Sequence, residues 1–137
     1  GRPVMVVPPK SESIARKRVA ISWNGSQQSA RAVSSAIKIS EQADAVMVLT
    51  ADSSRTSGTR GPELASYLEW HGIQPDTKVF ESPAGSVGPR LLEECTKFGA
   101  DLLVTGAYTH SRMRQFILGG VTKHVLGHAQ IPMLMAH

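Results

Sequence analysis

The 137-residue sequence has few aromatic side chains and a single cysteine. Phe, Trp and Tyr make up 5% of the residues, so a core has to be built from aliphatic side chains. One cysteine excludes an internal disulfide framework and fits a reducing compartment. The sequence contains no apolar run of 18 residues and does not open with a charged segment leading into an apolar one. We therefore expect no membrane span, no secretory signal and a cytoplasmic location.

Motifs of common catalytic sites are also missing. The sequence has neither a Gly-x-Ser-x-Gly nucleophile motif nor a complete Walker A motif. Cys95 lies within an apolar helical stripe, which indicates a core thiol. His124 and His128 lack the intervening Glu and the third ligand of a zinc site, so we interpret them as surface residues. Glu93 and Glu94 are interpreted as a solvated helix face. The sequence thus predicts no catalytic and no metal-binding residue.

The net charge of +4 comes from the amino-terminal segment alone. Residues 1–18 contain five Lys or Arg residues and one Glu, whereas residues 19–137 contain ten basic and ten acidic residues. Polyanion binding requires a basic face on the folded domain itself, so we do not expect nucleic acid as a partner. Residues 102–137, however, contain no acidic side chain but three basic ones, Arg112, Arg114 and Lys123. This segment can therefore lie beside a phosphate without repulsion, although a basic surface explains it equally well.

Apolar runs alternate with segments of helical periodicity along most of the chain. This alternation, with strands that are apolar throughout, predicts a parallel sheet covered by helices on both faces, a doubly wound α/β domain. We expect Tyr67 and Trp70 to be packing residues. The expected strands are residues 3–7, 18–23, 45–49, 77–81, 101–105 and 131–136, and the expected helices are residues 26–40, 62–71, 86–98 and 120–128.

Ligands of such sheets bind beyond the carboxyl ends of the strands, where the direction of winding reverses. The candidate site should therefore include the loops after Trp23 and after Thr105. Gly106 follows the second of these strands, and a glycine there permits close approach of the backbone to a ligand. Gly119 and Gly120 stand at the start of a predicted helix, whose free N–H groups attract an anion. The pattern predicts a phosphate-binding loop, and a loop that needs glycines only in order to turn is the alternative.

Residues 2–7 and 131–136 share one pattern, in which a residue and a proline are followed by four apolar residues. Chance explains so short a match, but the polar segment that follows residues 2–7 favours another interpretation. We expect residues 1–17 to be a strand and linker from a preceding similar domain, and residues 18–137 to be the domain itself. An edge strand needs cover, so Ile131–Ala136 is predicted to pair with residues 3–8 or with its copy in a homodimer.

The glycine pattern resembles the nucleotide motif of the universal stress protein family, which reads Gly, two residues, Gly, nine residues, Gly and then Ser or Thr. Gly106 and Gly119 match this motif, whereas Thr109 and Gly120 replace the second glycine and the hydroxyl residue. Asn24 stands where many members have Asp. The runs from Gly99 to Gly106 and from His128 to Pro132 add to a resemblance that covers nearly the whole chain.

The resemblance implies a stress-response module of five parallel strands in the order 3-2-1-4-5, similar to adenine-nucleotide alpha-hydrolases. It also implies a site for ATP with Mg²⁺, or else an interaction and dimerisation module with a degenerate pocket, since members of both kinds exist. A weak ATPase is a third alternative. The residues that the resemblance places around the nucleotide, together with Arg112 from its position, are Ser22, Trp23, Asn24, Thr50, Gly106, Tyr108, Thr109, Arg112, Gly119, Gly120, Val121 and Thr122.

Overall fold

The computed structural model describes residues 2–9, 11, 16–52, 60–83, 86–107 and 120–137. Six strands and four helices are found in these residues, close to the ranges that the apolar periodicity predicts. In chain order they are β1 (Val4–Val6), β2 (Arg18–Ser22), α1 (Gln27–Ser40), β3 (Ala45–Asp52), α2 (Arg60–Trp70), β4 (Pro75–Glu81), α3 (Val87–Phe98), β5 (Leu102–Gly106), α4 (Gly120–His128) and β6 (Met133–Ala136).

The strands form one mixed sheet in the order β1-β6-β5-β2-β3-β4. The predicted sheet of five parallel strands is therefore wrong in strand number and in the direction of one pair, because β1 adds a sixth strand antiparallel to β6. The pairs among β2 to β6 are all parallel. Winding proceeds from β2 through β3 to β4 and then continues on the other side of β2 with β5 and β6, so it reverses between β2 and β5.

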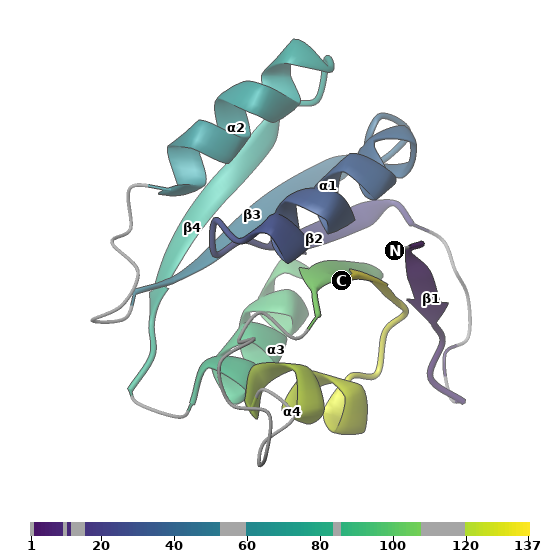
Figure 1. The fold of residues 1–137 in the computed structure, drawn as a ribbon, viewed down its shortest axis with the longest axis vertical. Helices are drawn as coiled ribbons and strands as arrows, with labels where there is room; N and C mark the ends of the chain where they lie inside the picture. The colour runs from purple at the N-terminus through teal and green to yellow at the C-terminus, as the bar shows by residue number, and fades with distance from the viewer. Residues whose placement is uncertain (1, 10, 12–15, 53–59, 84–85, 108–119) are drawn as a thin grey trace.

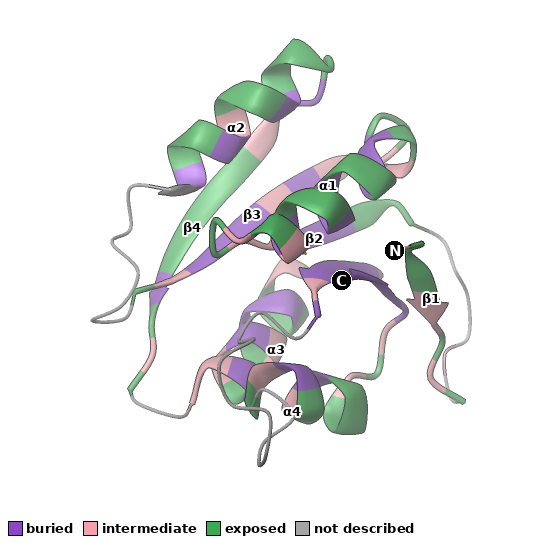
Figure 2. Ribbon diagram, in the orientation of Figure 1, coloured by how far each residue is buried: buried purple, intermediate pink, exposed green. Residues whose placement is uncertain are grey.

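Helices cover both faces of the sheet, as the sequence predicts (Figure 1). One apolar cluster joins α1 and α2 to one face, and a second joins α3 and α4 to the other. Of the strands between them, β2, β5 and β6 are buried over most of their length, which Figure 2 shows in purple. Trp70 departs from the expectation: its side chain is 91% exposed, and Tyr67 is also exposed, so neither is a core residue.

Local sequence signals set the helix ends. The Ser26 hydroxyl accepts a hydrogen bond from the Ser29 N–H at 3.1 Å and caps α1, as serine does at many helix starts. Gly99 ends α3 with a φ of 71°, a left-handed conformation in which a residue with a side chain would be strained. The Gly99 turn brings the chain directly into β5.

β1 covers the outer edge of β6. Val4, Met5 and Val6 lie opposite Met135, Leu134 and Met133. Met5 packs against the α1 side of the core and Val6 against the α4 side. The predicted pairing of the closing strand with residues 3–8 is thus confirmed within the chain, and the backbone groups of β6 have partners on both sides.

The seam between β2 and β5 is held at its start by charge. The Asp101 carboxylate accepts hydrogen bonds from the backbone N–H groups of Lys17 and Arg18, each at 2.9 Å. The Arg18 side chain then donates two hydrogen bonds to the carbonyl of Phe98, and its guanidinium carbon lies 4.4 Å from the centre of the Phe98 ring. These contacts join residues 80 to 84 positions apart and fix where β5 begins beside β2.

Replacing Asp101 with Ala should lower the free energy of unfolding by about 1–3 kcal/mol, because two N–H groups lose a charged acceptor. Urea denaturation followed by circular dichroism measures the change. Asp44→Ala is the matched control, since Asp44 is an exposed aspartate just before β3 whose side chain makes no interaction within the described residues. Equal losses for the two variants would contradict the role given to Asp101.

Candidate functional site

The carboxyl ends of β3, β2 and β5 meet at one edge of the sheet. Ser22, the last residue of β2, lies opposite Leu49 on one side and Thr105 on the other. Thr50 and Gly106 follow these two residues on the neighbouring strands. The structure therefore places three of the predicted site residues, Ser22, Thr50 and Gly106, at one edge of the sheet.

The segment after β2 is shaped by its own side chains. The Trp23 N–H donates to the carbonyl of Leu49 at 2.9 Å, and its half-buried side chain packs against the α1 side of the core. The Asn24 side-chain oxygen accepts a hydrogen bond from the Ser26 N–H at 3.1 Å. Gly25 has a positive φ of 70°, which completes the turn. Asn24 thus forms an Asx turn that leads into the cap of α1.

Thr50 is 1% exposed, and its hydroxyl has no hydrogen-bond partner among the described residues. A side chain on Gly61, at the start of α2, would place its Cβ 3.4 Å from this hydroxyl. Leaving such a group unpaired in a protein interior costs about 1–3 kcal/mol. The Thr50 hydroxyl, buried at the carboxyl edge of the sheet, can therefore donate a hydrogen bond to a ligand or accept one from it.

Three further predicted residues open α4. Gly120 is exposed, Val121 is half-buried and Thr122 is buried. A Cβ on Gly120 would meet no atom within 4 Å, so this glycine is not required by packing among the described residues. The other predicted residues of the loop between β5 and α4 lie outside the described residues, namely Tyr108, Thr109, Arg112 and Gly119.

Gly106 has a packing role that the sequence does not reveal. A Cβ at this position would lie 2.6 Å from the backbone nitrogen of Ser29 and 2.9 Å from the carbonyl carbon of Gln28. Both distances are shorter than van der Waals contact. The missing side chain therefore lets the first turn of α1 rest directly on the end of β5.

The substitution Gly106→Ala should lower the free energy of unfolding by about 1–3 kcal/mol, because backbone atoms have to move to admit the methyl group. Gly120→Ala, where the new Cβ meets open space, should change it by less than about 0.5 kcal/mol. Denaturant titration of the two variants beside the parent protein makes the comparison. A Gly106→Ala protein as stable as the parent would show that α1 does not rest on β5 in this way.

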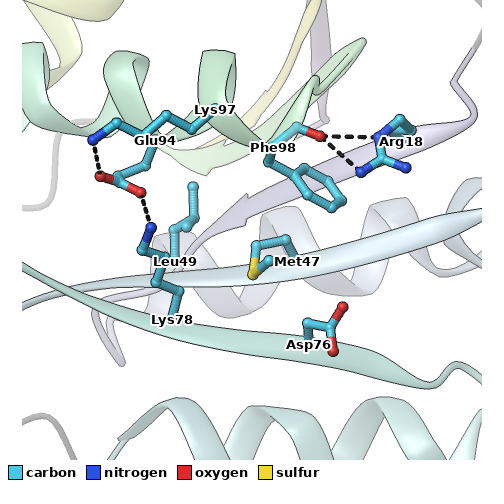
Figure 3. A pocket seen from close by; sticks show the side chains of 8 residues that line it. All are labelled: Arg18, Met47, Leu49, Asp76, Lys78, Glu94, Lys97 and Phe98. Atoms are coloured by element: carbon cyan, nitrogen blue, oxygen red, sulfur yellow. Dashed lines mark hydrogen bonds and ion pairs between the residues drawn. The ribbon is translucent and has the colours of Figure 1, made fainter.

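A hollow lies apart from this edge, between α3 and strands β3 and β4 (Figure 3). Its volume is about 330 Å³, and Met47, Leu49 and Phe98 supply its apolar surface. Charged residues gather at its two ends in Figure 3, with Glu94 at one end and Asp76 at the other. The complete lining is Arg18, Met47, Leu49, Asp76, Lys78, Glu94, Lys97 and Phe98.

Glu94 is the buried charge of this hollow. Its carboxylate is 3% exposed and pairs with Lys78 at 2.5 Å and with Lys97 at 3.0 Å. The interpretation of Glu93 and Glu94 as a solvated face is therefore wrong for Glu94. The available signal was spacing: Glu94 stands three residues after Leu91 and beside Cys95, both of which are buried in α3.

These contacts shift the titration of their groups. Hydrogen bonds from Lys78 and then Lys97 hold the pKa of Glu94 below its ordinary value of 4.5. Burial raises the pKa of the Cys95 thiol to about 12, so the thiolate is not formed at neutral pH. The interpretation of Cys95 as a core thiol is confirmed by its 2% exposure.

Because the pKa of Glu94 is lowered in the folded state, its stabilising effect is present above pH 4.5 and is lost as the pH falls below that value. Glu94→Gln should cost about 1.5–3 kcal/mol at pH 7, and the difference from the parent should shrink below pH 4.5. The measurement is urea denaturation across this pH range. Glu93→Gln is the control on the same helix, because Glu93 is 45% exposed and should matter much less. A pH-independent difference for Glu94→Gln would refute the assignment.

The two histidines of α4 contact each other. The rings of His124 and His128 stack with centroids 4.1 Å apart, and Nδ1 of His128 lies 2.8 Å from the carbonyl oxygen of His124. Among the residues that the structure describes, no three His, Cys, Asp or Glu side chains are grouped to hold a metal ion. Nor does any helix in this part of the chain have the length and apolarity to cross a membrane.

Comparison with solved structures identifies similar folds. A universal stress protein from Archaeoglobus fulgidus is 15% identical with a TM-score of 0.76, and the match covers 98% of this chain and 49% of that one. UspA from Lactobacillus plantarum is 14% identical with a TM-score of 0.61 over 89% and 98% of the two chains. A functionally unknown protein from Pseudomonas aeruginosa is 21% identical with a TM-score of 0.64 over 96% and 50%.

This chain thus spans about half the length of two of these proteins. No curated protein matches its sequence. The family model described as Universal stress protein family matches residues 15–137, which include β2 to β6 and all four helices. The chain therefore belongs to the Universal stress protein family.

Proposed function

We propose that this domain binds an adenine nucleotide at the carboxyl edge of β3, β2 and β5, and that occupancy of the site serves as its stress-response signal. The reversal of winding between β2 and β5 supports this location, because open α/β sheets bind ligands at such points. Membership of the family supports the ligand class. The proposed activity is binding, and no step of catalysis is assigned.

The observation that carries the proposal is the Thr50 hydroxyl. It is buried at this edge without a partner among the described residues, and it lies beside the first turn of α2. A purine offers both donors and acceptors on its edge, so it can satisfy a hydroxyl that the protein leaves unpaired. Ser22 and Trp23, on the adjacent strand end, would border the base and ribose.

The phosphates would lie toward the start of α4. Gly120 opens this helix without a side chain, and the last acidic residue of the chain is Asp101. Free N–H groups at a helix start and the absence of nearby carboxylates in the sequence both favour an anion. Mg²⁺ would be held by the phosphate oxygens of ATP and not by Asn24, because the Asn24 side-chain oxygen already accepts a hydrogen bond from the Ser26 N–H.

Calorimetry with ATP and Mg²⁺ on nucleotide-stripped protein should show saturable binding. At a ligand concentration one hundred times the Kd, binding should stabilise the fold by about 2.7 kcal/mol and raise the melting temperature. No heat and no thermal shift at millimolar nucleotide would sink the proposal. That result would favour the alternative of an interaction module with a degenerate pocket.

Thr50→Val isolates the contribution of the hydroxyl. Removing a buried, unpaired hydroxyl while keeping the shape should leave the free protein as stable as the parent or about 1 kcal/mol more stable, and nucleotide affinity should fall. Ser40→Ala is the matched control, because the Ser40 hydroxyl is also buried without a described partner but lies at the far end of α1. It should affect stability in the same direction and leave nucleotide binding unchanged. Unaltered affinity of Thr50→Val would remove Thr50 from the site.

A further inference from the structure

The two outer strands of the described sheet differ in how their free edges are covered. β6 has β1 on its outer side, so its backbone groups are already paired within the chain. Among the described residues β4 pairs only with β3, and five of its seven residues are exposed. Figure 2 shows β4 largely green at the border of the sheet, and Asp76 to Val79 are all exposed.

Charges alternate along this edge. Asp76 and Lys78 point to the α3 face of β4, where both line the hollow of Figure 3. Lys78 reaches across to the buried Glu94, whereas the Asp76 side chain makes no hydrogen bond or ion pair with any described residue. Lysine carries three N–H donors, so Lys78 retains the capacity to bind a second carboxylate.

We propose that β4 pairs antiparallel with β4 of a second copy of this chain, around a two-fold axis at Thr77. In this register Asp76 lies opposite Lys78 of the second copy, and Lys78 lies opposite its Asp76. Thr77 faces Thr77, and Val79 faces Pro75 on the α2 side. Opposite charges and paired threonines are both favourable as direct cross-strand neighbours.

The charge pattern selects this register over its neighbours. Centring the pair on Asp76 or on Lys78 would place identical charges directly opposite each other, which is unfavourable. Centring it on Val79 would leave Asp76 and Lys78 without charged partners. Two-fold pairing keeps each face of the sheet continuous, so the centre has to fall on a residue, and Thr77 is the centre that joins both charges.

Exposed apolar side chains lie along the same border. Val79 is 49% exposed on β4, and Trp70 is 91% exposed at the end of α2, five residues before β4 begins. The two-fold axis brings the end of β4 of one copy to the start of β4 of the other. Val79 of the second copy therefore arrives at the Trp70 end of α2, where burial of both side chains would add to the strand pairing.

Sedimentation velocity of the full chain should show a dimer that weakens with salt, since charge pairs are screened. Asp76→Lys places like charges opposite each other twice and should raise the dimer Kd about tenfold or more. Glu81→Lys makes the same change in net charge, but Glu81 falls beyond the overlap, opposite Ile73, and should leave the Kd unchanged. A parent protein that is still monomeric at about 0.5 mM overturns the proposal.

A cysteine at the axis tests the register directly. Thr77→Cys should form an intermolecular disulfide under mild oxidation, because directly opposite Cβ atoms lie within about 5.5 Å. Glu81→Cys should not, and the buried native Cys95 does not compete. Circular dichroism confirms that each variant folds. A dimer that survives Asp76→Lys, or that cross-links equally through positions 77 and 81, would show that another surface is responsible.

Discussion

The contact between Asp101 and the start of β2 is the constraint on which the other features depend. Its carboxylate accepts hydrogen bonds from two backbone N–H groups, and the Arg18 side chain donates to the Phe98 carbonyl at the end of α3. The chain has by then wound through β3 and β4, and this contact places β5 on the opposite side of β2. The reversal of winding, the meeting of three strand ends and the outer position of β4 all follow from that placement.

Much of the fold could be predicted because the signals were local. The apolar runs of β2, β3 and β5 were predicted to within one to three residues at each end, and the Gly99 turn was predicted where the structure has it. The residues that were misjudged depend on distant partners. Glu94 is buried because Lys78, from another strand, reaches it, and Trp70 is exposed because α2 presents that side to solvent. The antiparallel direction of β1 likewise depends on how the chain returns to β6.

The location of the candidate site could be predicted from the sequence, whereas the contacts within it could not. The rule that ligands bind where winding reverses pointed to the loops after β2 and β5, and the family resemblance added Ser22 and Thr50. It did not reveal that Gly106 is needed for contact with α1, or that the Asn24 side chain is used in the turn before that helix. Residues that a sequence pattern assigns to ligand binding can therefore also be needed for the packing that forms the site.

The site and the free edge lie on adjoining strands of the same sheet. Thr50 is opposite Val79 in the β3–β4 ladder, and Met47 is opposite Asp76. The buried hydroxyl proposed to meet the nucleotide is thus one strand away from a residue proposed to meet a second copy. Thr50 and Val79 share the α2 face, and α2 begins beside Thr50 and ends at Trp70. A ligand that fixes the start of α2 would act on the same helix whose other end borders the pairing edge, so one rigid element connects the two proposed surfaces.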